Sequence, residues 1–179
     1  MSPPPPPASA RARELMAALD LEFLPGESGW FAPAGRSNLQ VNVAGRTLAA
    51  HSRIFYLLTR ELPLNYLHRL ASDDTHVLLE GGPVEYFIFR ADGQAERLIL
   101  GGDLSTGQAA MISVPAGDWK SLRLAPGADY ALIANILTPE WTADRVEIGA
   151  GDEFVTRYRN AAPWANAPFL RELIGPNWR

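Results

Sequence analysis

The sequence predicts an all-β domain, a sandwich or barrel of short strands with a short helix near each end. Runs of β-branched and aromatic residues recur along the chain, and clusters of glycine, proline and aspartate separate them. Helix-forming composition is confined to 10–19 and 167–174. The chain is 47% hydrophobic and 20% charged, which is typical of a globular protein.

The N-terminal part begins with MSPPPPP, which predicts a disordered proline-rich tail over 1–8. Residues 9–179 are long enough to form one domain with its own core. Ser9 is a suitable N-cap for a helix over 10–19. The segment PGESGWF (25–31) predicts a turn, and we expect its two aromatic residues to be exposed.

Strand patterns begin at residue 38. Strands are predicted at 39–43, 53–58, two within 64–82, a hairpin at 84–100, and further strands at 109–114, 119–124, 129–137, 145–149 and 153–158. The last element differs, because Asn166 can cap a helix over 167–174 that Gly175-Pro176 would end.

The composition excludes several classes of function. The formal charge is −4 and no lysine- or arginine-rich run exists, which argues against nucleic acid and anionic membranes as partners. The chain has no cysteine, so it has neither disulfides nor thiolate chemistry. No apolar run is long enough to span a membrane, and prolines stand where a signal peptide would be apolar. We expect a cytoplasmic protein.

The stretch 64–82, LNYLHRLASDDTHVLLEGG, concentrates the polar residues of interest. It holds two of the three histidines and two adjacent aspartates. Because alternate residues of a strand face the same side, His68, Asp74 and His76 are predicted to share one interior face. Buried polar groups are costly unless they bind something, so this face predicts a small-molecule pocket.

The order RIFYLL, HRLASDD, EGGPVEYFIF and ISVPAGDWKSL resembles the cupin superfamily. It is similar above all to the small uncharacterised single-domain cupins of the "cupin 5" type, with PGESGWF in the place of their first motif. The resemblance covers about 25–150. It implies a double-stranded β-helix, a jelly-roll barrel with a central pocket.

The resemblance also implies a set of metal-ligand positions. His68 matches the first histidine of the cupin motifs and Asp74 stands where their glutamate belongs, whereas Leu70 and Lys120 replace the other two histidines. An ammonium group repels a divalent cation, so we predict no metal cofactor. If a metal does bind, the expected ligands are His68, Asp74 and His76.

The leading prediction is a metal-independent isomerase, epimerase or lyase that acts on a polar carbonyl or sugar-like substrate. His68 would be the base, Asp74 would orient it, and Lys120 would stabilise a developing oxyanion. The predicted substrate-binding residues are Tyr56, His76, Tyr86, Trp119 and Tyr130.

Two alternatives come from other classes. One is a metal-dependent cupin enzyme, and the other is a non-catalytic ligand-binding or structural cupin in which these polar residues only satisfy one another. A homodimer is expected in each case, because sheet edges need protection and Trp30 and Phe31 would supply apolar surface. Arg69, on the opposite face from His68, is expected at the surface or in an interface.

Overall fold

The structure, a computed structural model, describes residues 7–179, so most of the predicted tail lies outside the described residues. Its helices are α1 (Ala10–Ala18), α2 (Asp152–Tyr158) and α3 (Ala167–Ile174). Its strands are β1 (Glu22–Phe23), β2 (Trp30–Arg36), β3 (Gln40–Val43), β4 (Arg46–Ala49), β5 (Ser52–Thr59), β6 (Leu64–Leu70), β7 (Asp73–Gly81), β8 (Val84–Phe89), β9 (Ala95–Leu100), β10 (Met111–Val114), β11 (Trp119–Leu124), β12 (Tyr130–Thr138) and β13 (Val146–Ile148).

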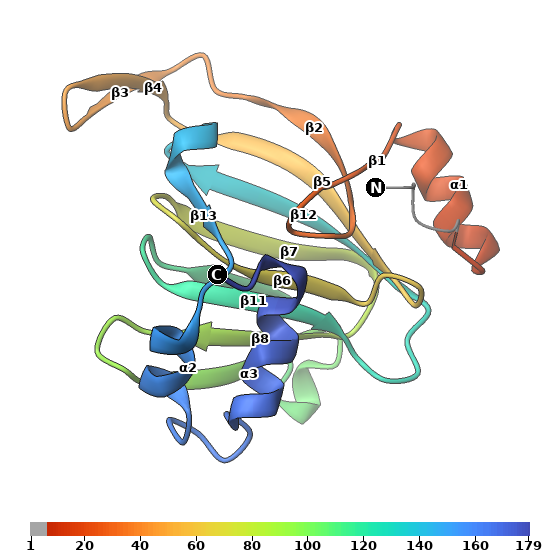
Figure 1. The fold of residues 1–179 in the computed structure, drawn as a ribbon. Helices are drawn as coiled ribbons and strands as arrows, with labels where there is room; N and C mark the ends of the chain where they lie inside the picture. Colours follow the sequence, from red (N-terminus) through yellow and green to blue (C-terminus); the bar gives the residue numbers. More distant parts are fainter. Residues whose placement is uncertain (1–6) are drawn as a thin grey trace.

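Two antiparallel sheets face each other and form the predicted jelly roll (Figure 1). One sheet has six strands in the order β1-β2-β5-β12-β7-β10, and the other has five in the order β13-β6-β11-β8-β9. Strands β3 and β4 form a separate hairpin that projects from the body. The sheets remain open at their edges, so the barrel is a sandwich-like jelly roll.

The core has three parts, one between the sheets and one on each outer face. Tyr86, Ile88, Leu122 and Ile133 are among the buried side chains between the sheets. Helix α1 covers the outer face of the six-stranded sheet. Helices α2 and α3 cover the outer face of the five-stranded sheet, where aromatic rings pack edge to face.

The terminal helices form as predicted. Ser9 accepts a hydrogen bond from the backbone nitrogen of Ala12 at 3.3 Å, and Asn166 accepts one from that of Phe169 at 3.0 Å. These bonds satisfy N–H groups that have no partner within the first turn. No helix within residues 7–179 is long and apolar enough to cross a membrane.

The predicted strand over 153–158 is wrong, because this segment forms helix α2. Phe154, Val155 and Tyr158 are its buried residues, and their spacing also matches one face of a helix. Asp152 and Glu153 lie in the first turn, where acidic side chains favour a helix. The outer face of the five-stranded sheet, which this helix covers, supplies the apolar contacts that select it.

The two aromatic residues after the predicted turn are not exposed. Trp30 is 8% exposed and packs under α1, and Phe31 is half-buried. Both belong to β2, a strand that the sequence analysis missed together with β1 and β4. The apolar surface on which the dimer prediction rested is therefore used within the chain, and the dimer stays a prediction.

The turn before β2 is fixed tightly against the barrel. Gly29 has a φ of 80°, and a Cβ atom there would lie 2.3 Å from the hydroxyl oxygen of Tyr56. That hydroxyl donates to the carbonyl oxygen of Ser28 at 2.8 Å. Glycine is required because it tolerates both the positive φ and the close approach. This contact sets the position of the turn that carries Glu27.

Candidate active site

A cavity of about 420 Å³ lies between the sheets at one end of the barrel. Residues from β2, β5, β6, β7 and β12 line it, together with the turn before β2 and Trp141. Its apolar walls include Leu24, Phe31, Ile54, Leu70, Leu137 and Trp141. Its polar and charged lining residues include Glu27, Arg36, Arg53, His68, Asp74 and Asn135. An apolar cavity with a few convergent polar groups is the usual form of a small-molecule site.

The buried imidazole of His68 has a different partner at each ring nitrogen. Nδ1 is 2.8 Å from the carbonyl oxygen of Tyr66. Because a carbonyl only accepts, Nδ1 carries the proton of the neutral ring and Nε2 keeps its lone pair. Nε2 lies 3.5 Å from Oε2 of Glu27. The basic nitrogen of His68 therefore faces a carboxylate that lines the cavity.

The surroundings of His68 keep it neutral. Burial lowers the pKa of His68, the negative charge of Glu27 opposes that shift, and the positive charge of Lys120 adds to it. A neutral imidazole is available to accept a proton near pH 7. Once protonated at Nε2, it would have Glu27 as its counter-ion. These are the properties of a general base.

Glu27 holds its place through its own backbone. Its carbonyl oxygen accepts a hydrogen bond from the backbone nitrogen of Tyr66 at 2.7 Å and from the side-chain amide of Asn65 at 3.2 Å. The turn and strand β6 are thus bonded directly to each other. The relative position of Glu27 and His68 follows from this link.

Asp74 is the centre of a second polar cluster. Its Oδ2 lies 2.6 Å from Nζ of Lys120, and its Oδ1 accepts a hydrogen bond from the side-chain amide of Asn135 at 2.8 Å. Nε2 of His76 lies 3.0 Å from the same Oδ1, and Nδ1 of His76 lies 2.6 Å from the hydroxyl of Tyr86. Asp74 and His76 come from β7 and Asn135 from β12 in one sheet, whereas Tyr86 comes from β8 and Lys120 from β11 in the other, so the cluster ties both sheets together.

The expectation that Asp74 orients His68 is not met, because Asp74 bonds to His76 and the carboxylate beside His68 is Glu27. Burial alone would raise the pKa of Asp74, but the neighbouring His76 and Lys120 outweigh burial and hold it well below its usual range. Asp74 is therefore a fixed anion in the cavity wall. Lys120, 1% exposed, is buried against Asp74.

The residues do not fit a divalent metal. Lys120 places an ammonium group against the carboxylate that would have to be a ligand, and Leu70 adds an apolar wall. His68 and His76 are engaged with different partners. Within residues 7–179, no three histidine, cysteine or acidic side chains converge as metal ligands. The alternative set of His68, Asp74 and His76 is therefore not assembled.

The four aromatic residues predicted to bind substrate lie elsewhere. Tyr56 and Tyr86 are buried in the core between the sheets, and their hydroxyls are hydrogen-bonded within the protein. Trp119 packs on the outer face against α2. Tyr130 donates to Glu80 at 2.6 Å beside α1. Trp119 and Tyr130 were predicted to bind substrate because they are aromatic. They occupy strand positions that face away from the space between the sheets, so they lie on the outer faces.

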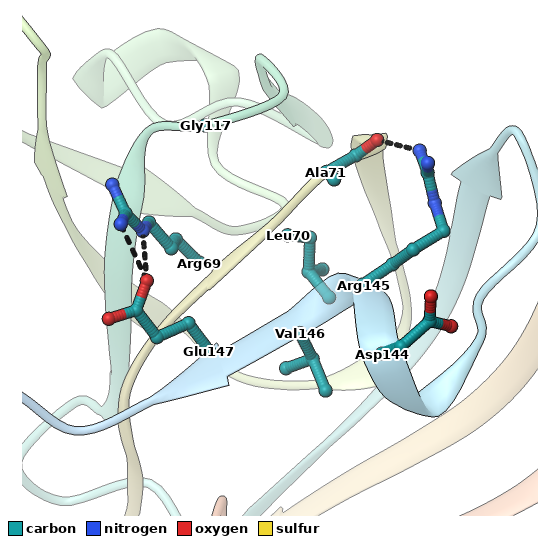
Figure 2. Close-up of a pocket in the computed structure, with 8 residues that line it drawn as sticks. All are labelled: Arg69, Leu70, Ala71, Gly117, Asp144, Arg145, Val146 and Glu147. Atoms are coloured by element: carbon teal, nitrogen blue, oxygen red, sulfur yellow. Dashed lines mark hydrogen bonds and ion pairs between the residues drawn. The ribbon is translucent and has the colours of Figure 1, made fainter. Parts of the chain in front are cut away.

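A second, smaller pocket of about 300 Å³ lies outside the barrel at the turn between β6 and β7. Figure 2 shows the residues that line it. Arg69 is at the surface, as predicted, and donates to Glu147 at 2.6 Å. Arg145 donates to the carbonyl oxygen of Ala71. Arg69, Glu147 and a terminal nitrogen of Arg145 are thus already engaged within the protein, which makes this pocket a less suitable ligand site than the barrel cavity.

Sequence reasoning missed five polar residues of the cavity, which are Glu27, Arg36, Ser52, Arg53 and Asn135. Glu27 lies within the glycine-containing turn motif PGESGWF, and a charged residue in that motif could have indicated a site residue. Asn135 pairs with His76 across β12 and β7, and Arg36 and Arg53 come from paired strands β2 and β5. None of these pairings between distant segments is visible in one sequence.

Comparison with known proteins places these features in a family. The family model described as Cupin superfamily (DUF985) matches residues 13–149. The curated relative is the uncharacterized protein YML079W of Saccharomyces cerevisiae, 29% identical over 89 residues. That match covers 48% of this chain and 44% of the yeast protein, so it spans less than half of the relative's length.

Solved structures share the fold. Protein SO0799 of Shewanella oneidensis has a TM-score of 0.79 at 21% identity, over 92% of this chain and 98% of that one. A hypothetical protein from Leishmania major has a TM-score of 0.72 at 27% identity, over 78% and 87% of the two chains. A variant of Bacillus subtilis oxalate decarboxylase has a TM-score of 0.50 at 9% identity, over 74% and 30%, which is a likeness of fold alone. Because the family model matches well over half of the chain, this protein belongs to the cupin superfamily, in its DUF985 family.

Proposed function

We propose that the cavity is an active site in which His68 removes a proton from the carbon next to a carbonyl group of a small polar substrate. The chemistry would be that of an isomerase or lyase, and it would proceed without a metal ion. One observation carries the proposal: a buried, neutral imidazole with a fixed tautomer directs its basic nitrogen at a cavity carboxylate.

The C–H bond breaks, its proton goes to Nε2 of His68, and the electron pair forms an enolate with its charge on the carbonyl oxygen. Glu27 stabilises the imidazolium that results. In an isomerase that acts on a 2-hydroxy carbonyl compound, the hydroxyl proton moves to the enolate oxygen, a new carbonyl group forms at the carbon that lost its proton, and the proton on His68 goes to the former carbonyl carbon. In a lyase the electron pair expels a leaving group from the β-carbon.

The cavity favours a one-base reaction over epimerisation. An epimerase that inverts a carbon centre needs an acid on the face opposite the base. Among residues 7–179, no tyrosine lines this cavity. Asp74 is held as an anion with its pKa well below the usual range, which makes it a poor proton donor. A proton transfer between adjacent carbons requires one base alone, and His68 is the imidazole that lines the cavity.

Asp74 and Lys120 have supporting roles in this proposal. The carboxylate of Asp74, fixed by Lys120 and Asn135, can accept a hydrogen bond from a substrate hydroxyl. Lys120 acts through Asp74 and also helps to keep His68 neutral. Asp74 is therefore a substrate-binding residue in this proposal, and Lys120 is a positioning residue.

Deuterium exchange tests the proposal without knowledge of the product. The protein is incubated in D₂O with hydroxyacetone, 4-oxopentanoate or phenylpyruvate, and NMR follows exchange at the carbon next to the carbonyl. We expect exchange above the uncatalysed rate for at least one compound, and loss of about 100-fold or more in His68→Gln. His51→Gln, in the loop between β4 and β5, is the matched control and should exchange normally.

Equal exchange by wild type and His68→Gln would contradict the proposal. Binding of these compounds without any exchange would favour a non-catalytic ligand-binding cupin.

A further inference from the structure

Two arginines stand at the open end of the cavity. Arg36 and Arg53 line it and are exposed, with the side chain of Arg36 72% exposed. The side chains of His68 and Asp74, which line the same cavity, are 4% and 1% exposed. The cavity therefore has a buried inner end with the base and an open outer end with two positive charges.

Arg53 is free to bind an anion. Among the ion pairs found within residues 7–179, none involves its guanidinium group. A Cβ atom at Gly35 would lie 3.1 Å from Nη2 of Arg53, and Gly35 has a φ of 111° beside a β-bulge. Because Gly35 has no side chain, the guanidinium group of Arg53 can occupy this space at the cavity mouth.

Arg36 also keeps donors available. One of its terminal nitrogens, Nη1, lies 3.4 Å from Oε2 of Glu140. The other oxygen of Glu140 accepts from the backbone nitrogen of Ala49 at 2.6 Å, so this carboxylate is anchored to β4. A guanidinium has five N–H donors, and this single long contact leaves most of them unused.

The inner end and the walls of the cavity indicate what the rest of a ligand should look like. Lys120 balances the charge of Asp74, and Glu27 is the remaining negative charge at the inner end. The walls between the two ends are apolar, and Trp141 at 48% exposure extends them at the mouth. A ligand that matches this pattern has hydroxyl or carbonyl groups inside, an apolar body, and an anionic group outside.

We propose that the substrates of this site are small carbonyl compounds with an apolar body and a terminal carboxylate or phosphate, which Arg53 and Arg36 bind at the cavity mouth. This substrate class rests on the proposed function. Arginine is suited to the role because its planar fork matches both anions. The positive mouth also attracts such anions to a chain whose net charge is −4.

Binding of unreactive probes separates recognition from catalysis. Isothermal titration calorimetry compares phenylacetate, phenyl phosphate and the neutral phenylacetamide, none of which is an aldehyde or ketone. We expect the anions to bind the wild type more tightly than the amide, and the better anion identifies the group. Arg53→Gln should weaken anion binding about tenfold or more, and Arg36→Gln should weaken it less. Neither variant should change binding of the amide.

Arg60→Gln is the matched control, because Arg60 is exposed, pairs with Asp129 and lies outside the cavity. His68→Gln should retain anion binding even if it loses exchange, so failure of the catalytic proposal is distinguishable from failure of this one. Amide and anions of equal affinity, no anion binding at millimolar concentration, or unchanged binding in Arg53→Gln would each overturn the inference.

Discussion

Lys120→Met removes the positive charge that neutralises Asp74 inside the barrel. The sequence predicts that Lys120 stabilises an oxyanion in the pocket, but Lys120 does not line the cavity. Both side chains of the pair are 1% exposed, and Nζ lies 2.6 Å from Oδ2. The substitution therefore leaves a carboxylate buried without its main counter-ion.

The magnitude follows from that burial. Removal of one partner of a buried ion pair costs about 3–5 kcal/mol. For a chain of this size, each kcal/mol lowers Tm by about 2–4 °C, so we expect Lys120→Met to melt about 6–20 °C below the wild type. The double variant Asp74→Leu with Lys120→Met carries neither charge and should recover most of the loss.

Urea unfolding followed by tryptophan fluorescence measures the two single variants and the double variant as a cycle. Arg60→Met, which breaks a pair whose side chains are 64% and 56% exposed, is the control and should change stability little. A Lys120→Met loss no larger than that of the control would refute the assignment of this pair as a buried structural unit.

The dependence on pH makes the test sharper. In the wild type the pKa of Asp74 is lowered, so its stabilising contribution is present above the ordinary aspartate pKa of about 3.9 and is lost as the pH falls below it. Without Lys120, we expect burial to raise the pKa of Asp74, so that protonation favours the folded variant. The stability gap between wild type and variant should shrink from pH 7 to pH 4. A gap that widens in acid would contradict this reasoning.

Three further predictions follow from the site and its supports. Because the pKa of His68 is lowered, a pH–rate profile should show the exchange rate falling in acid with a midpoint below about pH 6.5. Glu27→Gln removes a charge that raises this pKa, so it should move the midpoint lower still, and a shift to higher pH would contradict the role of Glu27. Gly29→Ala should lower Tm more than Gly45→Ala does. Both glycines have a positive φ, but only at Gly29 would a Cβ atom meet Tyr56. An equal loss of Tm in the two variants would argue against a role for that contact. The predicted homodimer should appear in light scattering at micromolar concentration, and a monomer alone would exclude it.

Strand content was predictable because alternation and turn residues are local signals. The elements that escaped prediction had other causes. Strand β2 contains Pro33 and Gly35, which weaken a strand pattern and here coincide with a bulge. The segment of α2 satisfies both periodicities over its short length, and packing on the neighbouring sheet decides between them. Tertiary contacts, which a single sequence does not contain, selected the helix.

The part of the site that lies on the consecutive strands β6 and β7 could be predicted from the sequence. His68 and Asp74 share the interior face because parity is a property of the strand alone. Glu27 and Arg53 reach the same cavity from segments whose pairing is set by the fold, so no local pattern joined them to His68. Alternation along a strand gives the face of a residue but not its neighbours from other strands. It therefore could not show that Glu27 lies beside His68 and Asp74 beside His76.

The ion pair of Lys120 with Asp74 limits what this cavity can do. In metal-binding cupins the cation would be available to a substrate, whereas here the ammonium charge is buried and paired with Asp74. In the proposed reaction, an enolate formed by His68 cannot rely on the charge of Lys120. Among residues 7–179, the exposed positive charges that line the cavity are those of Arg36 and Arg53 at its mouth. This arrangement restricts the reaction to carbonyl compounds whose C–H group is already acidic, such as 2-hydroxy ketones and 2-oxo acids. Phenylpyruvate and 4-oxopentanoate both carry a carboxylate and differ in the acidity of the C–H group, so we expect phenylpyruvate to exchange faster relative to the uncatalysed rates. The reverse order would mean that the cavity holds a group that stabilises the oxyanion.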